Sequence, residues 1–494
     1  MKRSFNILCL IAAVLLNMNA CGSGESGQKT ETTVQAESTA ETIKTEQVLS
    51  AAEQIQQKFD GVDLGGKVFS ILAPDASSHW IYSGKFNEVY AEETTGEVVN
   101  DQLFHRNQSI EELLHAALQF DLQGAIGTIE TIIANNVTAG DNTYALSLTT
   151  MTAQASNMIK GNLYNVHTLE HLELSNPWWE KNQIDTFTLD DKLYWLCGDI
   201  NIGDDYAVQV LYFNKDMCSE FQLLNPYEAI LDGTWTLDML FDMTETVKAD
   251  TNGDGEMTLE DRWGVVDAND HIKHWMYSMG SRLIEVSEGN TLRLCSLDEN
   301  HIQVVDTLFG YMVDREMMYP GNVNADVSAF TEGNTLFFST QLWTLEQFRD
   351  MDDDFGIIPM PKLNEQQVGY GAYLSHGGAT AFAVPVTVSV PAEVGMLLEV
   401  MGGLSADTLH SAFYDTLFAS KLVRDTESVA SLDTILSSKV YDWGIDFTWG
   451  ADFNTVYGNI VVNKSNDLVS KMKSIESKVQ SKLDEVVATI EELP

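Results

Sequence analysis

The chain has 494 residues, enough for two or three domains with buried cores. Apolar residues make up 44% and aromatic residues 10%, a composition that excludes an intrinsically disordered chain. The 73 acidic and 28 basic residues give a formal net charge of −45. Because such a surface repels phosphate backbones and anionic lipids, nucleic acid is excluded as a class of partner.

The first 20 residues have the pattern of a secretion signal. Two basic residues precede an apolar run over 7–16, about half of the roughly 20 residues that a membrane span requires. An ordinary signal peptidase needs small residues at the last and third-last positions before its cut; Ala20 fits and Met18 does not. The boundary MNAC resembles a bacterial lipoprotein signal, which implies that 1–20 is removed and Cys21 is lipidated. The alternative is a plain secreted protein.

The next segment has a composition that cannot form a core. Residues 22–50 contain no aromatic residue and are dominated by Gly, Ser, Thr, Glu and Gln. Because such a segment cannot offset the entropy of ordering, we expect a flexible tether over 21–56. A lipid anchor and a tether predict a location at the cell membrane on the extracellular face, or in the periplasm if the cell has an outer membrane.

The rest of the chain alternates between strand-like and helix-like segments. The β-rich run KVFSILAP (67–74) is followed by apolar residues at helical spacing over 99–120 and again over 126–133. This alternation predicts an α/β fold in which helices cover parallel sheets. The later segments are strand-like at 144–148, 209–214, 355–361 and 379–386, and helical at 234–249 and 467–493.

Three cysteines follow the predicted lipidation site. Cys197, Cys218 and Cys295 show neither metal-binding nor redox spacing, and an odd number does not suggest a disulfide framework. We therefore expect buried free thiols. A bridge between Cys197 and Cys218 stays open as the alternative.

Three segments carry a resemblance to a known family. They read VLYFNKDMCSEFQLLNPYEAILDGTWTLDMLFDMTETV (210–247), FTEGNTLFFSTQLWTLEQFRDMDDDFGIIPMPK (330–362) and ETTGEVVNDQLFHRNQSIEELL (93–114). Together with the lipoprotein start, they resemble in the same order the sugar-type (family 1) bacterial extracellular solute-binding proteins of ABC importers.

The resemblance implies a two-lobed periplasmic-binding-protein-like fold, in which two parallel or mixed sheets with flanking helices are joined by a hinge around a ligand cleft. Lobe one would contain 57–212 with 380–420, and lobe two 213–379 with 421–494. The implied function is to capture a mono- or oligosaccharide outside the membrane and deliver it to ABC permease subunits. The protein would be a monomer without catalytic activity. The alternative is a surface glycan-binding or glycan-sensing lipoprotein without a transporter.

A neutral sugar needs aromatic faces for its apolar patches and planar polar groups for its hydroxyls. The resemblance places Trp343 at the position of a stacking tryptophan, with a core residue as the alternative. Other candidates lie in loops after predicted strands, where ligands bind in open α/β sheets, or match cleft regions more loosely. They are Trp80, Thr149, Met151, Asp199, Trp275, Tyr277 and Trp449, with Asp204 and Trp443 as weaker candidates.

The sequence DTNGDGEMTLED (250–261) has the spacing of a calcium loop. The predicted side-chain ligands are Asp250, Asn252, Asp254 and Asp261, and Glu256 would offer its carbonyl. Asp261 replaces the usual Glu, and its shorter reach weakens a two-oxygen grip. Only one such loop is present, and a turn into a strand follows it. We therefore expect bound Ca²⁺ to be a structural staple in lobe two and not a switch.

One motif leaves an enzymatic alternative open. HTLEH (167–171) matches the inverted zinc-peptidase pattern H-x-x-E-H, which requires one long helix to align both histidines. Gly161 before the motif and Pro177 after it leave little room for a helix. We expect a loop there, and a zinc peptidase is the least favoured function.

Overall fold

The computed structural model contains one compact unit over residues 49–494. The predicted signal peptide, Cys21 and most of the tether lie outside the described residues, as do Trp80 and Trp449. Among the helices of the described part, none combines the length and apolarity of a bilayer span. The described residues are 49–78, 87–124, 126–267, 272–287, 291–319, 327–419, 425–446 and 450–493.

The first sheet has the strand order β11-β3-β1-β2. β1 (Lys67–Pro74) pairs in parallel with β2 (Ala116–Gln123) along its whole length and with β3 (Leu146–Thr150), whereas β11 (Thr380–Ala383) is antiparallel to β3. All five residues of β3 are buried, as expected for a strand covered on both faces. The surrounding helices are α1 (Ala51–Phe59), η1 (Ala76–Ser78), α2 (Val98–Leu114), α3 (Ile126–Ala139), α4 (Met151–Ile159), η2 (Val166–Thr168), α5 (Lys181–Phe187), α13 (Pro391–Asp407) and α14 (Leu409–Ala419).

The second sheet has the order β5-β8-β4-β9. β4 (Gln209–Asn214) is antiparallel to its neighbours β8 (Thr335–Gln341) and β9 (Phe355–Ile358), and β5 (Trp263–Asp267) is parallel to β8. All residues of these four strands are buried. The helices around this sheet are α7 (Lys215–Glu220), α8 (Pro226–Leu231), α9 (Leu237–Val247), α12 (Ser328–Thr331), η4 (Leu342–Phe348) and α15 (Thr426–Ser437).

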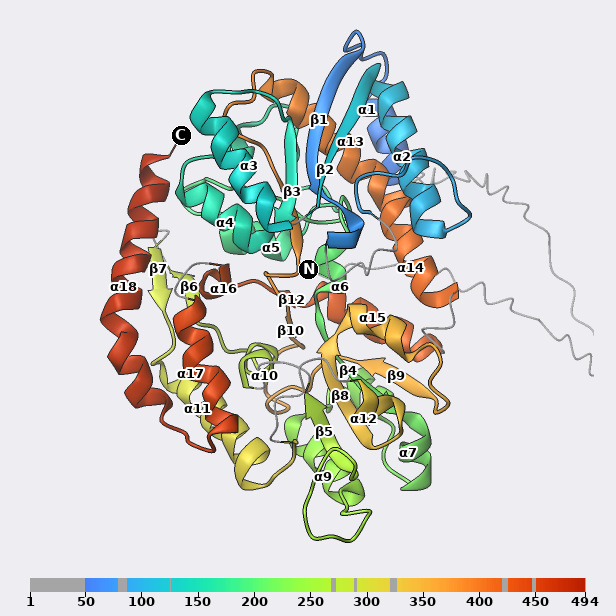
Figure 1. Ribbon diagram of the computed structural model, residues 1–494, viewed down its shortest axis with the longest axis vertical. Helices are drawn as coiled ribbons and strands as arrows, with labels where there is room; N and C mark the ends of the chain where they lie inside the picture. Colours follow the sequence, from blue (N-terminus) through green and yellow to red (C-terminus); the bar gives the residue numbers. More distant parts are fainter. Residues whose placement is uncertain are drawn as a thin grey trace, which may run out of the picture. The chain divides into compact units, whose positions relative to one another are not determined.

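A helical layer formed by the C-terminal segment and the chain after β5 completes the unit (Figure 1). In it α18 (Leu468–Glu492) packs against α17 (Gly450–Val462) and against β7 (Thr291–Leu294), the hairpin partner of β6 (Ile284–Ser287). The buried residues of α18 recur on one face at helical spacing, which explains its long amphipathic pattern. The remaining elements are α6 (Gly203–Tyr206), α10 (Ile272–Ser278), α11 (Glu299–Phe309), η3 (Gly310–Asp314), α16 (Trp443–Asp446), and the parallel pair β10 (Ala372–Tyr373) and β12 (Lys439–Val440).

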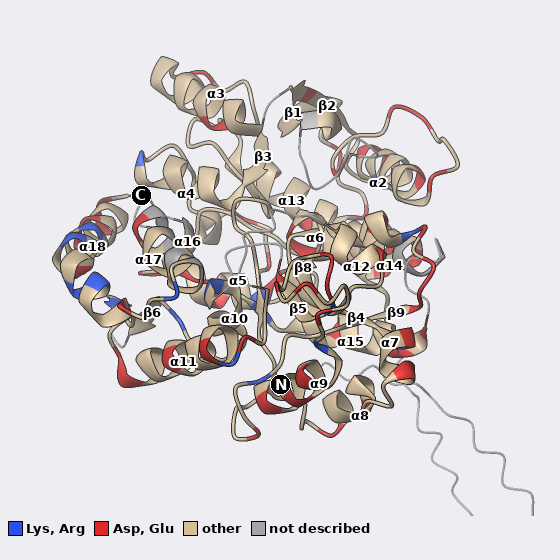
Figure 2. Cartoon of the chain, turned by 60° about the horizontal axis from the view of Figure 1, so that its bottom comes forward, with Lys and Arg blue, Asp and Glu red and all other residues tan. Residues whose placement is uncertain are grey.

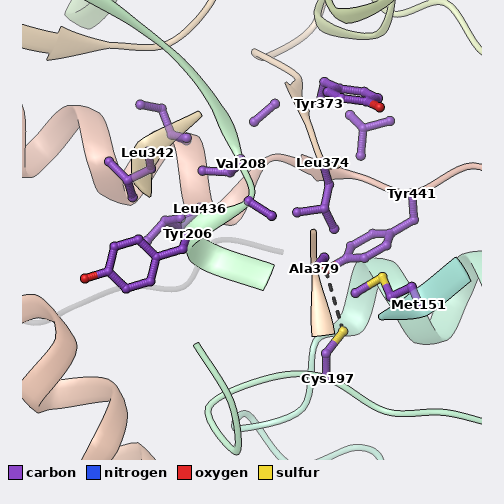
Figure 3. Packing of buried hydrophobic residues seen from close by; sticks show 14 of the residues in the cluster. Met151, Cys197, Tyr206, Val208, Leu342, Tyr373, Leu374, Ala379, Leu436 and Tyr441 are labelled. Atoms are coloured by element: carbon purple, nitrogen blue, oxygen red, sulfur yellow. Dashed lines mark hydrogen bonds between the residues drawn. The ribbon is translucent and has the colours of Figure 1, made fainter. Parts of the chain in front are cut away.

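Three backbone stretches run side by side between the two sheets: 203–208, 372–379 and 439–443. We call them the crossing region. Val208 forms an antiparallel bridge with Leu374, and β10 pairs with β12. Figure 3 shows the apolar packing at this place, where Met151 from the end of β3 and Leu342 from the end of β8 belong to one buried cluster. The core is therefore continuous through the crossing region.

The helical pattern predicted over 99–120 ends early. α2 stops at Leu114, His115 adopts a left-handed conformation with φ 47°, and 116–123 forms β2. The helix prediction is wrong for this last part, because pairing with all eight residues of β1 decides the conformation of AALQFDLQ. α1 starts at Ala51, within the segment predicted as tether, and Ser50 caps it in a reciprocal capping box with Glu53.

Candidate ligand-binding site

Strands from both sheets end at the crossing region. After β3, the Met151 N–H donates to the Ala379 carbonyl at 2.9 Å, and after β8 the Leu342 N–H donates to the Val208 carbonyl at 2.9 Å. The carboxyl ends of these strands are therefore brought to one place. In open α/β sheets, this is where ligands bind.

Trp343 directly follows the end of β8 and is half-buried. Its Nε1–H donates to Oε1 of Gln341, the last residue of β8, at 3.1 Å. Because Gln341 is fixed in the sheet ladder opposite Gln209, it restricts the orientation of the indole. A partly exposed aromatic face in a fixed orientation suits stacking on a flat apolar surface of a ligand.

Thr149 and Met151 lie at the end of β3 with fully buried side chains. The Thr149 hydroxyl donates to the Ile126 carbonyl at 3.4 Å. Thr150 between them is the N-cap of α4 and accepts a hydrogen bond from the Ala153 N–H. In this structure the two predicted residues shape the strand end and offer no side-chain surface to solvent.

Trp275 and Tyr277 on α10 are fully buried as well. Trp275 donates its Nε1–H to Oδ2 of Asp267 at 2.7 Å. Tyr277 stacks on Tyr373 of the crossing region with ring centroids 5.4 Å apart, and His274 stacks on the same ring at 4.4 Å. These stacking contacts pack α10 against the crossing region. Trp443 is also buried and donates its Nε1–H to the Thr186 carbonyl.

Asp199 is partly exposed and lies beside a histidine. Its Oδ1 is 3.6 Å from Nδ1 of His410, whose Nε2 is 3.7 Å from Oδ2 of Asp205. Among the predicted saccharide-binding residues that the structure describes, Asp199 and Trp343 are the two with side-chain surface open to solvent.

The nearby Asp204 does not lie in a solvated turn, the environment favoured by its sequence context. It is 1% exposed on α6, and Lys439 donates to it at 2.5 Å and to Asp205 at 2.8 Å. Glu180 is 3.1 Å from the same ammonium. We call Lys439 and these three carboxylates the crossing cluster. Sequence reasoning missed Lys439, because nothing local in KVYD distinguishes it from a surface lysine.

The charges of the crossing cluster do not balance. Burial lowers the pKa of Lys439, but Asp204 and Asp205 outweigh this effect and raise the pKa well above its ordinary value. Burial raises the pKa of Asp204, and Lys439 opposes the increase only in part. One ammonium therefore holds three carboxylates, and burial favours the protonated form of Asp204 by raising its pKa.

The predicted calcium loop is an exposed turn organised by its own side chains. The Asp250 carboxylate accepts from the N–H groups of Gly253 and Gly255 at 2.7 and 2.8 Å, and Gly255 has the left-handed φ of 84° that the sharp turn requires. Asn252 accepts from the Asp254 N–H, and Asp254 from the Glu256 N–H, both at 2.8 Å.

Asp261 closes this loop. It accepts from Thr258 N–H at 2.8 Å and Thr251 N–H at 3.0 Å, and the Thr258 bond is the main reason that its pKa is lowered. Within the described residues, no three His, Cys, Asp or Glu side chains are grouped closely enough to hold a metal ion.

The H-x-x-E-H motif does not lie on a helix. His167 belongs to the three-residue 3₁₀ turn η2, and His171 follows in a left-handed turn with φ 71°. The three described cysteines, Cys197, Cys218 and Cys295, are free, so the alternative bridge between Cys197 and Cys218 is wrong. Cys197 is buried and lies 3.7 Å from the Tyr441 hydroxyl in the cluster of Figure 3.

No family model and no curated protein matches this sequence. Solved structures do. A cyclo/maltodextrin-binding protein in complex with maltotetraose superposes with a TM-score of 0.57 at 13% identity, over 86% of this chain and 97% of the other. The extracellular solute-binding protein from Staphylococcus aureus in complex with maltose gives 0.58 at 10% identity, over 84% and 98%. An ABC substrate-binding protein from Listeria monocytogenes in complex with cycloalternan gives 0.54 at 12%, over 85% and 99%.

The chain therefore has the two-lobed α/β fold of periplasmic solute-binding proteins, as the sequence predicted. The first sheet belongs to one lobe and the second sheet to the other. The chain passes between the two sheets in the crossing region.

The crossing cluster predicts a strong effect of Lys439→Met. Removing the ammonium leaves buried carboxylates uncompensated, which should lower the free energy of unfolding by about 3–5 kcal/mol at pH 8. An unpaired buried carboxylate has a folded-state pKa above its unfolded value, so stability is regained as the pH falls. Chemical denaturation should therefore show a smaller deficit at pH 5.

The matched control is Lys181→Met, which removes the exposed ion pair with Asp185. This change should cost less than about 0.5 kcal/mol at either pH. Equal losses in the free energy of unfolding for the two variants would show that the crossing cluster does not stabilise the crossing region.

Proposed function

We propose that this protein is the substrate-binding component of an ABC importer, which captures a carbohydrate outside the membrane, delivers it to permease subunits and performs no catalysis. The observation that carries the proposal is the fold, which extends over nearly the whole of three solved binding proteins with maltotetraose, maltose or cycloalternan bound. The protein acts as a monomer.

The site chemistry supports a neutral, hydroxyl-rich ligand. Trp343 at the end of β8 supplies an aromatic face, and Asp199 at the crossing region supplies carboxylate oxygens that accept hydrogen bonds from hydroxyls. A negatively charged ligand is disfavoured by the net charge of −45. The two lobes close on the ligand by rotation at the crossing region.

The stacking role of Trp343 is tested by substitution. Trp343→Ala should weaken binding of the best saccharide by at least about tenfold, because truncating an aromatic residue at a binding centre costs roughly 2 kcal/mol. The saccharide is first identified by a thermal-shift screen of mono- and oligosaccharides, and affinity is then measured by calorimetry.

Trp343→Phe is the matched control, because it keeps an aromatic face and loses only the hydrogen bond to Gln341. It should retain most of the affinity. Unchanged affinity in Trp343→Ala would remove this residue from the site. Failure of every saccharide to bind the native protein would contradict the carbohydrate assignment, and saccharide binding without permease-dependent uptake would favour a glycan sensor.

The same proposal includes an anchor at the N-terminus. Lipidation of Cys21 at the MNAC boundary would hold the protein at the membrane through the tether. Cys21→Ala should release the protein from the membrane fraction or block its maturation, as seen by fractionation and immunoblotting. Cys218→Ala, at a partly buried thiol, should stay in the membrane fraction. A Cys21→Ala protein of normal mature size in that fraction would contradict the anchor.

We also propose that the 250–261 loop binds Ca²⁺ as a structural staple. The donor types suit Ca²⁺, since Asp250, Asn252, Asp254 and Asp261 carry hard oxygen atoms and Gly255 already adopts the turn, and the carboxylates would move together around the ion. Each oxygen that accepts an N–H here has a second lone pair. The loop starts three residues after α9 ends at Val247, so a bound ion would fix that end of the helix.

Calcium should raise the melting temperature without contributing to ligand contacts. At a hundredfold excess over Kd a ligand of the folded state adds about 2.7 kcal/mol, or a few degrees. Asp250→Ala should abolish this shift, and Glu245→Ala on the exposed face of α9 should keep it. Zn²⁺ should not substitute. A change in saccharide affinity above about tenfold on chelation would show coupling to the cleft and contradict the staple role.

A further inference from the structure

One cavity of the described residues lies outside the crossing region. It is a groove of about 700 Å³ on the second-sheet lobe, and all of its lining residues fall within 221–246 and 364–366. The loop before α8, one face of α9 and the loop after β9 form its walls. No residue of the first-sheet lobe contributes, so this groove is separate from the proposed saccharide site.

One wall of the groove has two rows of side chains on α9. Asp238 and Asp242 form an exposed acidic row, and Met239 and Met243 lie beside them, each pair one turn apart; Met239 is half-buried and Met243 is only 4% exposed. Like charges at this spacing weaken an isolated helix by a few tenths of a kcal/mol. Figure 2 shows acidic residues along α9, and Glu365 adds a third carboxylate from the opposite loop.

The lining residues include no basic side chain. Two neighbouring arginines stack on aromatic rings instead. Arg262 lies 4.6 Å from the ring of Phe221, and Arg315 lies 5.2 Å from the ring of Phe241. None of the salt bridges found among the described residues involves Asp238, Asp242 or Glu365. The groove thus presents carboxylates that form no ion pair with a lining residue. Asp238 also accepts a hydrogen bond from the Tyr311 hydroxyl, and Arg315 lies 4.4 Å from the Tyr311 ring.

Exposed apolar side chains occur on or near the segments that form the walls of the groove. Leu224, which lines the groove, is 66% exposed; Leu231, just before the lining Thr234, is 79% exposed; and Val368, just after the lining Gln366, is fully exposed. These are three of the seven strongly exposed large apolar side chains in the described residues. Leu224 is the one of the three that lines the groove, where it adds exposed apolar surface beside the carboxylates.

The backbone holds Leu224 outward. Gln222 adopts a left-handed conformation with φ 53°, which is unfavourable for a residue with a side chain, and the Leu223 N–H donates to the Cys218 carbonyl at 2.9 Å. This turn makes Leu223 and Leu224 a ridge between the groove and a second hollow of about 370 Å³. The ridge and its two hollows suit an elongated partner.

We propose that this groove is a docking site for a cationic amphipathic segment of a partner protein. Apolar side chains of the segment pack on Met239 and the Leu223–Leu224 ridge, and its Lys or Arg side chains pair with Asp238, Asp242 and Glu365. Methionine surfaces adapt to varied apolar side chains. A second copy of this chain is a poor occupant, because two bodies of net charge −45 repel each other.

The test uses a short helical peptide of leucine and lysine, with leucine along one face, and the full mature protein without saccharide. Asp242→Lys should weaken binding by about tenfold or more relative to Glu485→Lys, an exposed position on α18 with the same change in net charge. Leu224→Ser should also weaken it. Binding is measured by fluorescence anisotropy at physiological salt, and hydrogen exchange should show protection at 221–224, 237–246 and 364–366.

Two control peptides separate the contributions. Replacing lysine with glutamate should abolish binding, and replacing leucine with serine should weaken it. Equal loss of affinity in Asp242→Lys and Glu485→Lys would show general charge attraction and overturn the proposal. Dimerisation of the native protein that Asp242→Lys abolishes, seen by sedimentation, would overturn the choice of occupant. Neither result depends on whether the other site binds a saccharide.

Discussion

The structure depends on a single buried ammonium at the crossing region. Lys439 of β12 holds Asp204 and Asp205, which precede β4, and Glu180, which caps α5. A buried ion pair gains little net stability over an apolar core of the same shape, but it tolerates few geometries. We infer that the cluster fixes the register in which the crossing strands leave one lobe and enter the other.

This constraint explains why the lobes are discontinuous in sequence. The first sheet receives its edge strand β11 after the chain has completed the second sheet, so the backbone must return between them. Each return places a polar backbone in a buried environment, where every N–H and carbonyl needs a partner. The bridge between Val208 and Leu374 and the pairing of β10 with β12 supply these partners.

The sequence correctly predicted the strands and helices that the local residue pattern determines. The buried strands β1, β4 and β11, the helix α9 and the long α18 each have a periodicity or an apolar run of their own, and the ordered resemblance supplied the two-lobed fold. Prediction from the sequence failed where contacts between residues far apart in the chain determine the local structure. AALQFDLQ becomes a strand only beside β1, and Asp204 is buried because Lys439 approaches from 235 positions away. The burial of Trp275 and Tyr277 could not be predicted from the sequence either, because it depends on contacts with Asp267 and Tyr373.

Helix α9 links the features of the second lobe. Its inner face lies so close to β5 that a Cβ on Gly264 would fall 2.1 Å from the Thr244 Cβ, so the helix has little freedom to shift relative to the sheet. At the start of α9, the Leu237 N–H donates to the carbonyl of Lys362, in the segment after β9, at 2.9 Å. Its last turn leads into the 250–261 loop. The groove-lining residues of α9 therefore lie on a helix that is held along its inner face and at its N-terminal end. An ion bound in the 250–261 loop would also hold its C-terminal end. A docking surface on such a helix loses little conformational entropy on binding.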